Sequence, residues 1–192
     1  MQSIETTFNL RLWTVEEYHR IASSGILDEN ERVELLEGKI IWMSAKGTAH
    51  TSAVARTYKL FERHLDGFAW IISQDPITLN NYSEPEPDIS VVKIDPIDYA
   101  DHHPTPDEVD LIIEVADSSL KFDREIKSQS YAKARIRDYW ILDVINPLLY
   151  VLRQPSENGY DKEIILDENE AISPLQFPDL QVRVKDMLPP VI

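Results

Sequence analysis

Asp88, Glu114 and Lys127 are the side chains whose types and spacing fit chemistry with a divalent cation. Asp88 directly follows Pro87, so the chain enters the next predicted strand in an extended form, with the carboxylate at the end of that strand. Glu114 lies within the apolar run Leu111–Ala116. A carboxylate buried there needs a cation, hydrogen-bond donors or a raised pKa, because an uncompensated buried charge is costly.

Lys127 belongs to a predicted helix in which Asp123, Lys127 and Tyr131 follow one another at intervals of four residues. This spacing places the three side chains along one face of the helix. If the helix returns to the strand ends, it brings an ammonium group to Asp88 and Glu114. Two carboxylates, a backbone carbonyl and water are ligands that Mg²⁺ and Mn²⁺ prefer. Such an ion polarises a phosphoryl oxygen and acidifies a bound water, while a lysine orients that water or stabilises charge on phosphorus.

Each of these residues also has a simpler explanation when it is considered alone. Asp88 fits a capping or turn aspartate, and Glu114 fits a glutamate on a solvated face or one paired with a structural arginine. Lys127 fits an exposed lysine paired with Asp123. A tertiary structure that brings the three candidates together, or keeps them apart, separates the two interpretations.

The chain begins with a predicted helix and a predicted hairpin. Thr14 and Glu17 form a capping-box pattern, which indicates a helix that ends near Ser23. Two strand-like runs at 32–36 and 39–43 surround a Glu-Gly pair, which indicates a hairpin.

Two longer helices and several strands are predicted after the hairpin. A helix over 48–66 has a face spaced at three and four residues, formed by His50, Val54, Tyr58, Phe61 and Leu65. A second helix is predicted from an N-cap at Asp123 to about Arg135. Strands are predicted at 68–79, 88–94, 110–116, 138–142, 148–152 and 164–166.

The order of elements between residues 48 and 143 reads α-β-β-β-α-β, which predicts an α/β fold with helices packed on a sheet. With 192 residues, the chain fits a single domain over 1–192. We expect its core at about 32–152, preceded by the N-terminal helix and followed by a C-terminal β extension at about 153–192.

Composition excludes several classes of protein and makes one class difficult. The chain has no cysteine, which excludes disulfides and cysteine-ligated metal centres. No apolar run is long enough to cross a bilayer and no secretory signal is visible, so we expect a cytoplasmic protein without a membrane partner. The formal net charge of −15 opposes nonspecific attraction to nucleic acid, so such a function requires a local site.

The segment from Lys121 to Arg137 is the one concentrated basic stretch, with six bases and two acids. It fits phosphate contacts beside the site, and it equally fits a solvated helix face that balances acids elsewhere. His102-His103 with Asp101 is a poor metal cluster, because adjacent side chains in a loop diverge. We expect the tryptophans Trp42, Trp70 and Trp140 to pack in the core.

Two segments resemble the Uma2 family of restriction-endonuclease-like proteins: 86–92, and 113–143 with its strand glutamate, Asp-x-x-x-Lys-x-x-x-Tyr and Asp-Tyr-Trp. That family belongs to the PD-(D/E)XK nuclease superfamily, and the resemblance covers roughly residues 32–142. It implies the restriction-endonuclease-like fold with its α-β-β-β-α-β core.

The resemblance also implies site residues and a reaction. It indicates Asp88 and Glu114 as ligands of Mg²⁺ or Mn²⁺, Lys127 as the catalytic cation, and Glu34 in the hairpin as a further acid. His50, Asp123 and Tyr131 are possible accessory residues. The expected activity is hydrolysis of DNA phosphodiester bonds, in a homodimer because cutting a duplex takes two sites.

One departure from the superfamily pattern leaves other functions open. The lysine expected two residues after Glu114 is replaced by Ala116, and the resemblance implies that Lys127 has taken its place from the following helix. This departure and the negative charge favour an alternative, a catalytically inactive interaction protein with the nuclease fold. A metal-dependent hydrolase of a small phosphorylated substrate is a third possibility.

Overall fold

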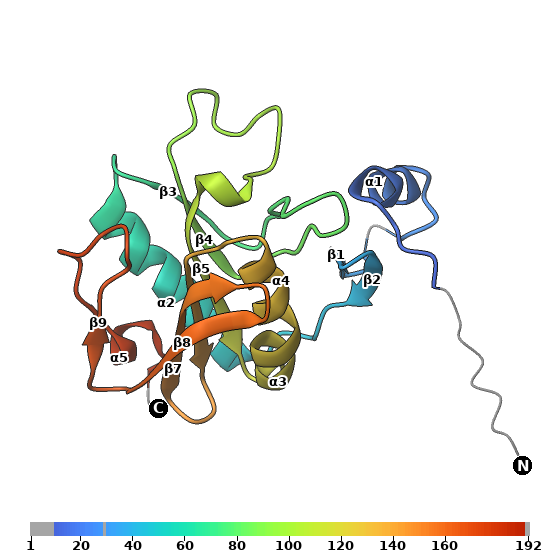
Figure 1. The fold of residues 1–192 in the computed structure, drawn as a ribbon. Coiled ribbons are helices and arrows are strands. Elements are labelled where there is room, and N and C mark those ends of the chain that lie inside the picture. The colour runs from blue at the N-terminus through green and yellow to red at the C-terminus, as the bar shows by residue number, and fades with distance from the viewer. Residues whose placement is uncertain (1–9, 29, 191–192) are drawn as a thin grey trace, which may run out of the picture.

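The computed structural model describes residues 10–28 and 30–190, and a six-stranded sheet forms its centre (Figure 1). The strands lie in the order β3-β4-β5-β6-β7-β8; β5 and β6 are parallel, and the other neighbours are antiparallel. Their bounds are Trp70–Ile72, Ile89–Val92, Val109–Ala116, Asp138–Asp143, Leu148–Ser156 and Gly159–Asp167.

Helices cover both faces of this sheet (Figure 1). On one face α2 (Thr48–Leu65) packs against β3, β4 and β5, and the short helix α5 (Val184–Met187) packs against α2. On the other face α3 (Leu120–Phe122), the π-helical segment η2 (Asp123–Lys127) and α4 (Ser128–Lys133) follow one another without a break. Within the described residues, no helix combines the length and apolar character that a membrane span needs.

β5 is buried along its whole length, and its side chains alternate between two hydrophobic cores. Leu111, Ile113 and Val115 belong to the core under α2, whereas Ile112 and Ala116 belong to the core under α4. The same alternation directs Glu114 to the face covered by η2 and α4. The apolar run in the sequence therefore places one carboxylate inside the protein.

The N-terminal elements agree with their predicted pattern. Thr14 and Glu17 form both hydrogen bonds of a capping box at the start of α1 (Val15–Ser23). β1 (Val33–Leu36) and β2 (Lys39–Trp42) form an antiparallel hairpin. Its two turn residues have φ values of 49° and 72°, the left-handed conformation that a two-residue hairpin turn requires.

Several elements differ from their predicted form. The helix begins at Leu120 rather than at Asp123, so Asp123 is not its N-cap; its carboxylate accepts a hydrogen bond from Ser119 Oγ at 2.6 Å. The expected strand over 68–79 is reduced to β3. At the C-terminus, β9 (Ala171–Ile172), β10 (Val182–Arg183) and α5 were not expected, and they form because their apolar side chains pack on the core under α2.

Candidate active site

Glu114 lies near the end of β5 and is almost inaccessible to solvent. Its Oε1 accepts hydrogen bonds from Lys127 Nζ at 3.0 Å and from Tyr131 Oη at 2.8 Å. Burial raises the pKa of the carboxyl to about 8, although the ammonium of Lys127 acts in the opposite direction. The strand glutamate is therefore held by an internal cation and a phenol.

Lys127 is the internal cation, and it joins two carboxylates from distant parts of the chain. Its Nζ lies 3.0 Å from Glu114 Oε1 and 3.1 Å from Glu34 Oε2. Burial lowers the pKa of the ammonium, but the charges of Glu114 and Glu34 outweigh this effect and raise the pKa above its ordinary value. Lys127 therefore stays protonated and serves as a hydrogen-bond donor.

Glu34 reaches the site because the hairpin is attached to the segment that precedes β4. Leu35 in β1 forms an isolated β-bridge with Glu84, with a backbone hydrogen bond of 2.8 Å from Glu84 N to Leu35 O. Two residues further on, Glu86 N donates to Glu34 Oε2 at 3.2 Å. The side chain of Glu34 is thereby held beside Lys127.

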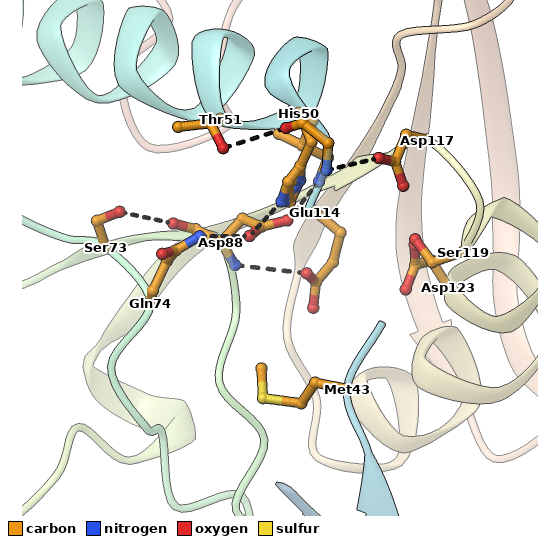
Figure 2. Close-up of polar contacts among 12 residues, drawn as sticks. Met43, His50, Thr51, Ser73, Gln74, Asp88, Glu114, Asp117, Ser119 and Asp123 are labelled. Atoms are coloured by element: carbon orange, nitrogen blue, oxygen red, sulfur yellow. Dashed lines mark hydrogen bonds and ion pairs between the residues drawn. The ribbon is translucent and has the colours of Figure 1, made fainter. Parts of the chain in front are cut away.

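Asp88 lies immediately before β4, as the preceding proline indicates, and it contacts the end of β5 (Figure 2). Its Oδ1 accepts a hydrogen bond from Gln74 Nε2 at 3.0 Å, and its Oδ2 accepts one from Val115 N at 2.9 Å. Its own backbone N–H donates to Glu114 Oε2 at 3.4 Å. These contacts link the two acids that the sequence singles out.

The accessory residues lie around this pair. His50 is buried in the first turn of α2, with Nε2 3.1 Å from Asp88 Oδ1, and neither ring nitrogen makes a hydrogen bond of good geometry. Asp123 is buried in η2, and burial raises the pKa of its carboxyl to about 6, against the effect of Lys127. Tyr131 lies behind Glu114 as its phenol donor.

A pocket of about 280 Å³ opens onto these groups. Asp88, Glu114 and Asp123 approach it from three different elements (Figure 2). Six of the seven residues indicated by the sequence line the pocket, and Tyr131 is the one that does not. The lining residues among the candidates are Glu34, His50, Asp88, Glu114, Asp123 and Lys127.

The carboxylate oxygens that line the pocket are the kind of ligand that a hard divalent cation prefers. Four buried carboxylates, those of Glu34, Asp88, Glu114 and Asp123, line the pocket with a single buried ammonium; burial is the main cause of the raised pKa values of Glu114 and Asp123, and the charges of neighbouring acids add to it. No group of three His, Asp or Glu side chains in residues 10–28 and 30–190 is arranged to hold a metal. An ion held by Asp88 and Glu114 therefore needs backbone oxygen and water as further ligands.

The basic stretch before β6 does not form a free cationic surface. Lys127 is internal, and the other bases contact acids or backbone oxygens elsewhere on the protein. Their partners are Glu125 for Lys121, Glu163 for Arg124, Glu37 for Lys133, the carbonyl of Pro155 for Arg135 and Asp110 for Arg137. The stretch thus balances acids, the second of the two interpretations that its sequence allows.

One wall of the pocket consists of residues that the sequence did not indicate as functional. The end of β2 and the loop after it contribute Trp42 and Lys46, and Arg32 lies beside them. Trp42 is 68% exposed, so its predicted place in the core is wrong, as it is for Trp70, whereas Trp140 is fully buried. The hydrophobic pattern of β2 could not reveal this, because a short hairpin alone does not determine which face the protein covers.

Comparison with known proteins supports this architecture. A family model, Uma2, described as "Putative restriction endonuclease", matches residues 15–185. A crystal structure of a "putative nuclease belonging to DUF820" from Anabaena variabilis is similar with a TM-score of 0.69 and 21% sequence identity, over 91% of this chain and 96% of that one. A search of the curated proteins found no match.

The structural similarity confirms the restriction-endonuclease-like α/β fold, since identity at this level supports the fold alone. The family model extends over most of the sequence and includes the hairpin, both carboxylate strands and the helix of Lys127. A nuclease is the class of function that this assignment supports. The chain belongs to the Uma2 family.

Proposed function

We propose that this protein is a metal-dependent nuclease that hydrolyses phosphodiester bonds in DNA. One observation supports the proposal above the others: Lys127 lies at 3.0 and 3.1 Å from two buried acids in a pocket that also contains Asp88. Side chains from the hairpin, from the residue before β4, from β5 and from η2 meet there. A structural ion pair needs no such gathering of uncompensated carboxylates.

In this proposal, Asp88 and Glu114 hold Mg²⁺ or Mn²⁺. The ion supplies polarisation of a phosphoryl oxygen and a more acidic bound water. Lys127 donates a hydrogen bond to the attacking water or to the developing phosphorane, because its raised pKa keeps it protonated. Glu34 and Tyr131 position the ammonium and the glutamate through the contacts described above.

The substitution of the in-register lysine by Ala116 does not remove the required charge. The ammonium of Lys127 contacts the same strand glutamate from the covering helix, at hydrogen-bond distance. We include a cytoplasmic homodimer in the proposal, since cutting both strands of a duplex takes two sites. Sedimentation velocity on the full chain tests that part separately.

Cleavage of supercoiled plasmid in Mg²⁺ or Mn²⁺ tests the nuclease function. We expect the wild-type protein and Glu62→Gln, a control at an exposed position of α2, to nick the plasmid. We expect Glu114→Gln and Asp88→Asn to lose this activity while circular dichroism reports an unchanged fold. Activity that survives both changes would contradict the assignment of the site.

Two further outcomes of the same assay separate the alternatives. An inactive wild-type protein that binds no divalent ion in calorimetry identifies a non-catalytic interaction protein. Release of phosphate from nucleotides without any nicking of DNA identifies a hydrolase of a small phosphorylated substrate. Neither outcome changes the fold.

A further inference from the structure

The wall of the pocket opposite the carboxylates has a different chemical character. It is formed by Arg32, Trp42, Met43 and Lys46, in and beside the end of β2. These residues carry two positive charges and one large aromatic surface. None of them contributes an oxygen ligand, so this wall has no role in holding a cation.

Arg32 and Lys46 differ from most bases near the pocket because neither forms an ion pair within the described residues. The nearest polar partner of Arg32 is the sulfur of Met43, 4.0 Å from Nη2. Burial lowers the pKa of Lys46 and the neighbouring charge of Arg32 lowers it further, whereas the charges of Asp88, Glu86 and Glu114 act in the opposite direction. These two adjacent cations make no ion pair, on a protein with a net charge of −15, and they offer a position for an anion although the carboxylate of Glu86 also lies within range of their charges.

Trp42 supplies the second independent observation. Its side chain is 68% exposed although indole is among the most costly side chains to leave in water. Trp140, at the centre of the sheet, is by contrast fully buried. An aromatic face beside two unpaired cations matches the two parts of a nucleotide, because bases stack on indole and phosphates pair with Arg and Lys.

We propose that Trp42 stacks on an unpaired nucleobase next to the scissile phosphodiester, while Arg32 and Lys46 contact the flanking phosphate. The substrate is then single-stranded DNA, or a duplex with an unpaired nucleotide at the cleavage point. This inference deepens the proposed nuclease function and rests on it. It also gives a role to the exposed Trp42, which was predicted to pack in the core.

The requirement for an unpaired base follows from geometry and from charge. Inside a duplex both faces of a base are covered by its neighbours, so an indole reaches a base face only where stacking is interrupted. Among the described residues, the pocket offers two exposed or half-exposed cations without an ion pair, Arg32 and Lys46, which is enough for one or two phosphates of a flexible strand. A duplex binder needs a longer row of phosphate contacts to overcome the negative charge of this protein.

Fluorescence anisotropy with a labelled twelve-nucleotide oligothymidine and a labelled blunt duplex of twelve base pairs, formed from two strands, tests the inference. Ca²⁺ replaces the catalytic ion, so that binding is measured without cleavage. We expect the single strand to bind more tightly than the duplex. Trp42→Ala should weaken binding of the single strand about tenfold, the size expected for the loss of one base–aromatic stack, and Trp42→Phe should retain most of the affinity.

Two controls identify the cause of any loss. Trp70→Ala removes another partly exposed tryptophan that does not line the pocket, and it should leave binding unchanged. Arg32→Gln and Lys46→Gln should each reduce the slope of log affinity against log salt by about 0.7, as expected for one lost phosphate contact with a single strand. Thermal melts verify that each variant is folded.

Equal binding of the two oligonucleotides, together with an unchanged affinity of Trp42→Ala, would overturn the inference. If the wild-type protein nevertheless nicks plasmid in Mg²⁺ or Mn²⁺, the nuclease function stands without the inference. If the single strand binds through Trp42 but no cleavage occurs in Mg²⁺ or Mn²⁺, the binding site stands and the nuclease function fails. A dimer that dissociates in Trp42→Ala would assign the exposed indole to a second copy of this chain, and would also overturn the inference.

Discussion

Asp138 and Glu114 are both buried carboxylates of the central sheet, yet their surroundings differ in charge balance. Asp138, at the start of β6, accepts hydrogen bonds from Trp140 Nε1 and Arg153 Nε at 2.8 Å, from Arg153 Nη2 at 3.1 Å and from Leu175 N at 2.8 Å. One acid is matched by one guanidinium and two further donors. Glu114 instead shares one ammonium with the buried Glu34, and two more buried acids, Asp88 and Asp123, line the same pocket.

The difference separates a structural charge from a functional one. A buried ion pair is tolerated when its hydrogen bonds are complete, as they are around Asp138. The carboxylates around Lys127 remain in excess, and proteins retain such an arrangement where a ligand completes it. The pair of Asp138 with Arg153, called the balanced pair, and the carboxylates around Lys127, called the unbalanced cluster, should therefore respond differently to the same kind of change.

The largest effect on stability is expected at the balanced pair. Arg153→Met leaves Asp138 buried without its cation, and this should lower the free energy of unfolding by about 3–5 kcal/mol, measured by urea denaturation. Arg183→Met, at an exposed position, is the matched control. An equal loss in both variants would mean that the contacts of Asp138 contribute little.

The largest effect on activity is expected at the unbalanced cluster. Lys127→Met removes the ammonium from the reacting groups and should reduce the rate of DNA cleavage about 100- to 1,000-fold, the cost of losing one transition-state donor. Lys59→Met changes an exposed lysine of α2 and should leave the rate unaltered. A Lys127→Met protein that is folded and fully active would remove this lysine from the mechanism.

Addition of a divalent ion should stabilise the folded protein through the unbalanced cluster. Mg²⁺ at about 100 times its dissociation constant should raise the free energy of unfolding by about 2.7 kcal/mol, because the ion binds the folded state. We expect the increase to disappear in Asp88→Asn and to persist in Asp66→Asn, which alters an exposed acid. Equal stabilisation of both variants would indicate that the ion binds elsewhere.

The smallest effect is expected on the free energy of unfolding when the pH is varied in the presence of EDTA. Burial raises the pKa of Glu114 to about 8 and that of Asp123 to about 6, above the ordinary values of 4.5 and 3.8. The folded state therefore holds protons that the unfolded state has released, so stability falls as the pH rises from about 4 through 8. Acids with a lowered pKa, such as Glu108 and Asp117, act in the opposite direction.

The comparison of wild type with Glu114→Gln isolates this contribution. Urea denaturation at pH 5, 7 and 9 should show a decline in the free energy of unfolding of the wild type that is steeper by up to about 1.4 kcal/mol per pH unit, the limit for one titrating group. The Gln variant should show a shallower decline because its side chain does not titrate. Parallel curves would mean that the carboxyl of Glu114 titrates normally.

Several features of the fold and site could be predicted because they depend on neighbours in the sequence. The capping box at Thr14 and the apolar face of α2 are local patterns, and both are present. The apolar run around Glu114 correctly indicated a buried carboxylate that needs a partner. The four-residue spacing of Lys127 and Tyr131 correctly placed both side chains on one face, although the turn between Asp123 and Lys127 is π-helical.

Other features depend on contacts between distant segments, and no local pattern encodes them. Asp123 resembles an N-cap in the sequence. In the structure the helix already begins at Leu120, so about one turn precedes Asp123. Trp42 reads as a core residue within an apolar strand, yet the hairpin projects from the sheet and leaves it exposed. The charges of Lys121 to Arg137 read as a basic surface until the positions of their acidic partners are known.

The amino-acid sequence by itself determined which residues could do chemistry and which strands and helices carry them, since residue type and hydrophobic periodicity act over a few positions. Tertiary structure alone decided that Lys127 meets Glu114 and Glu34, and that Arg32, Trp42 and Lys46 complete the opposite wall. The reason is that electrostatic pairing and solvent exposure depend on distances in space. The packing of the hairpin, the sheet and the covering helices sets those distances.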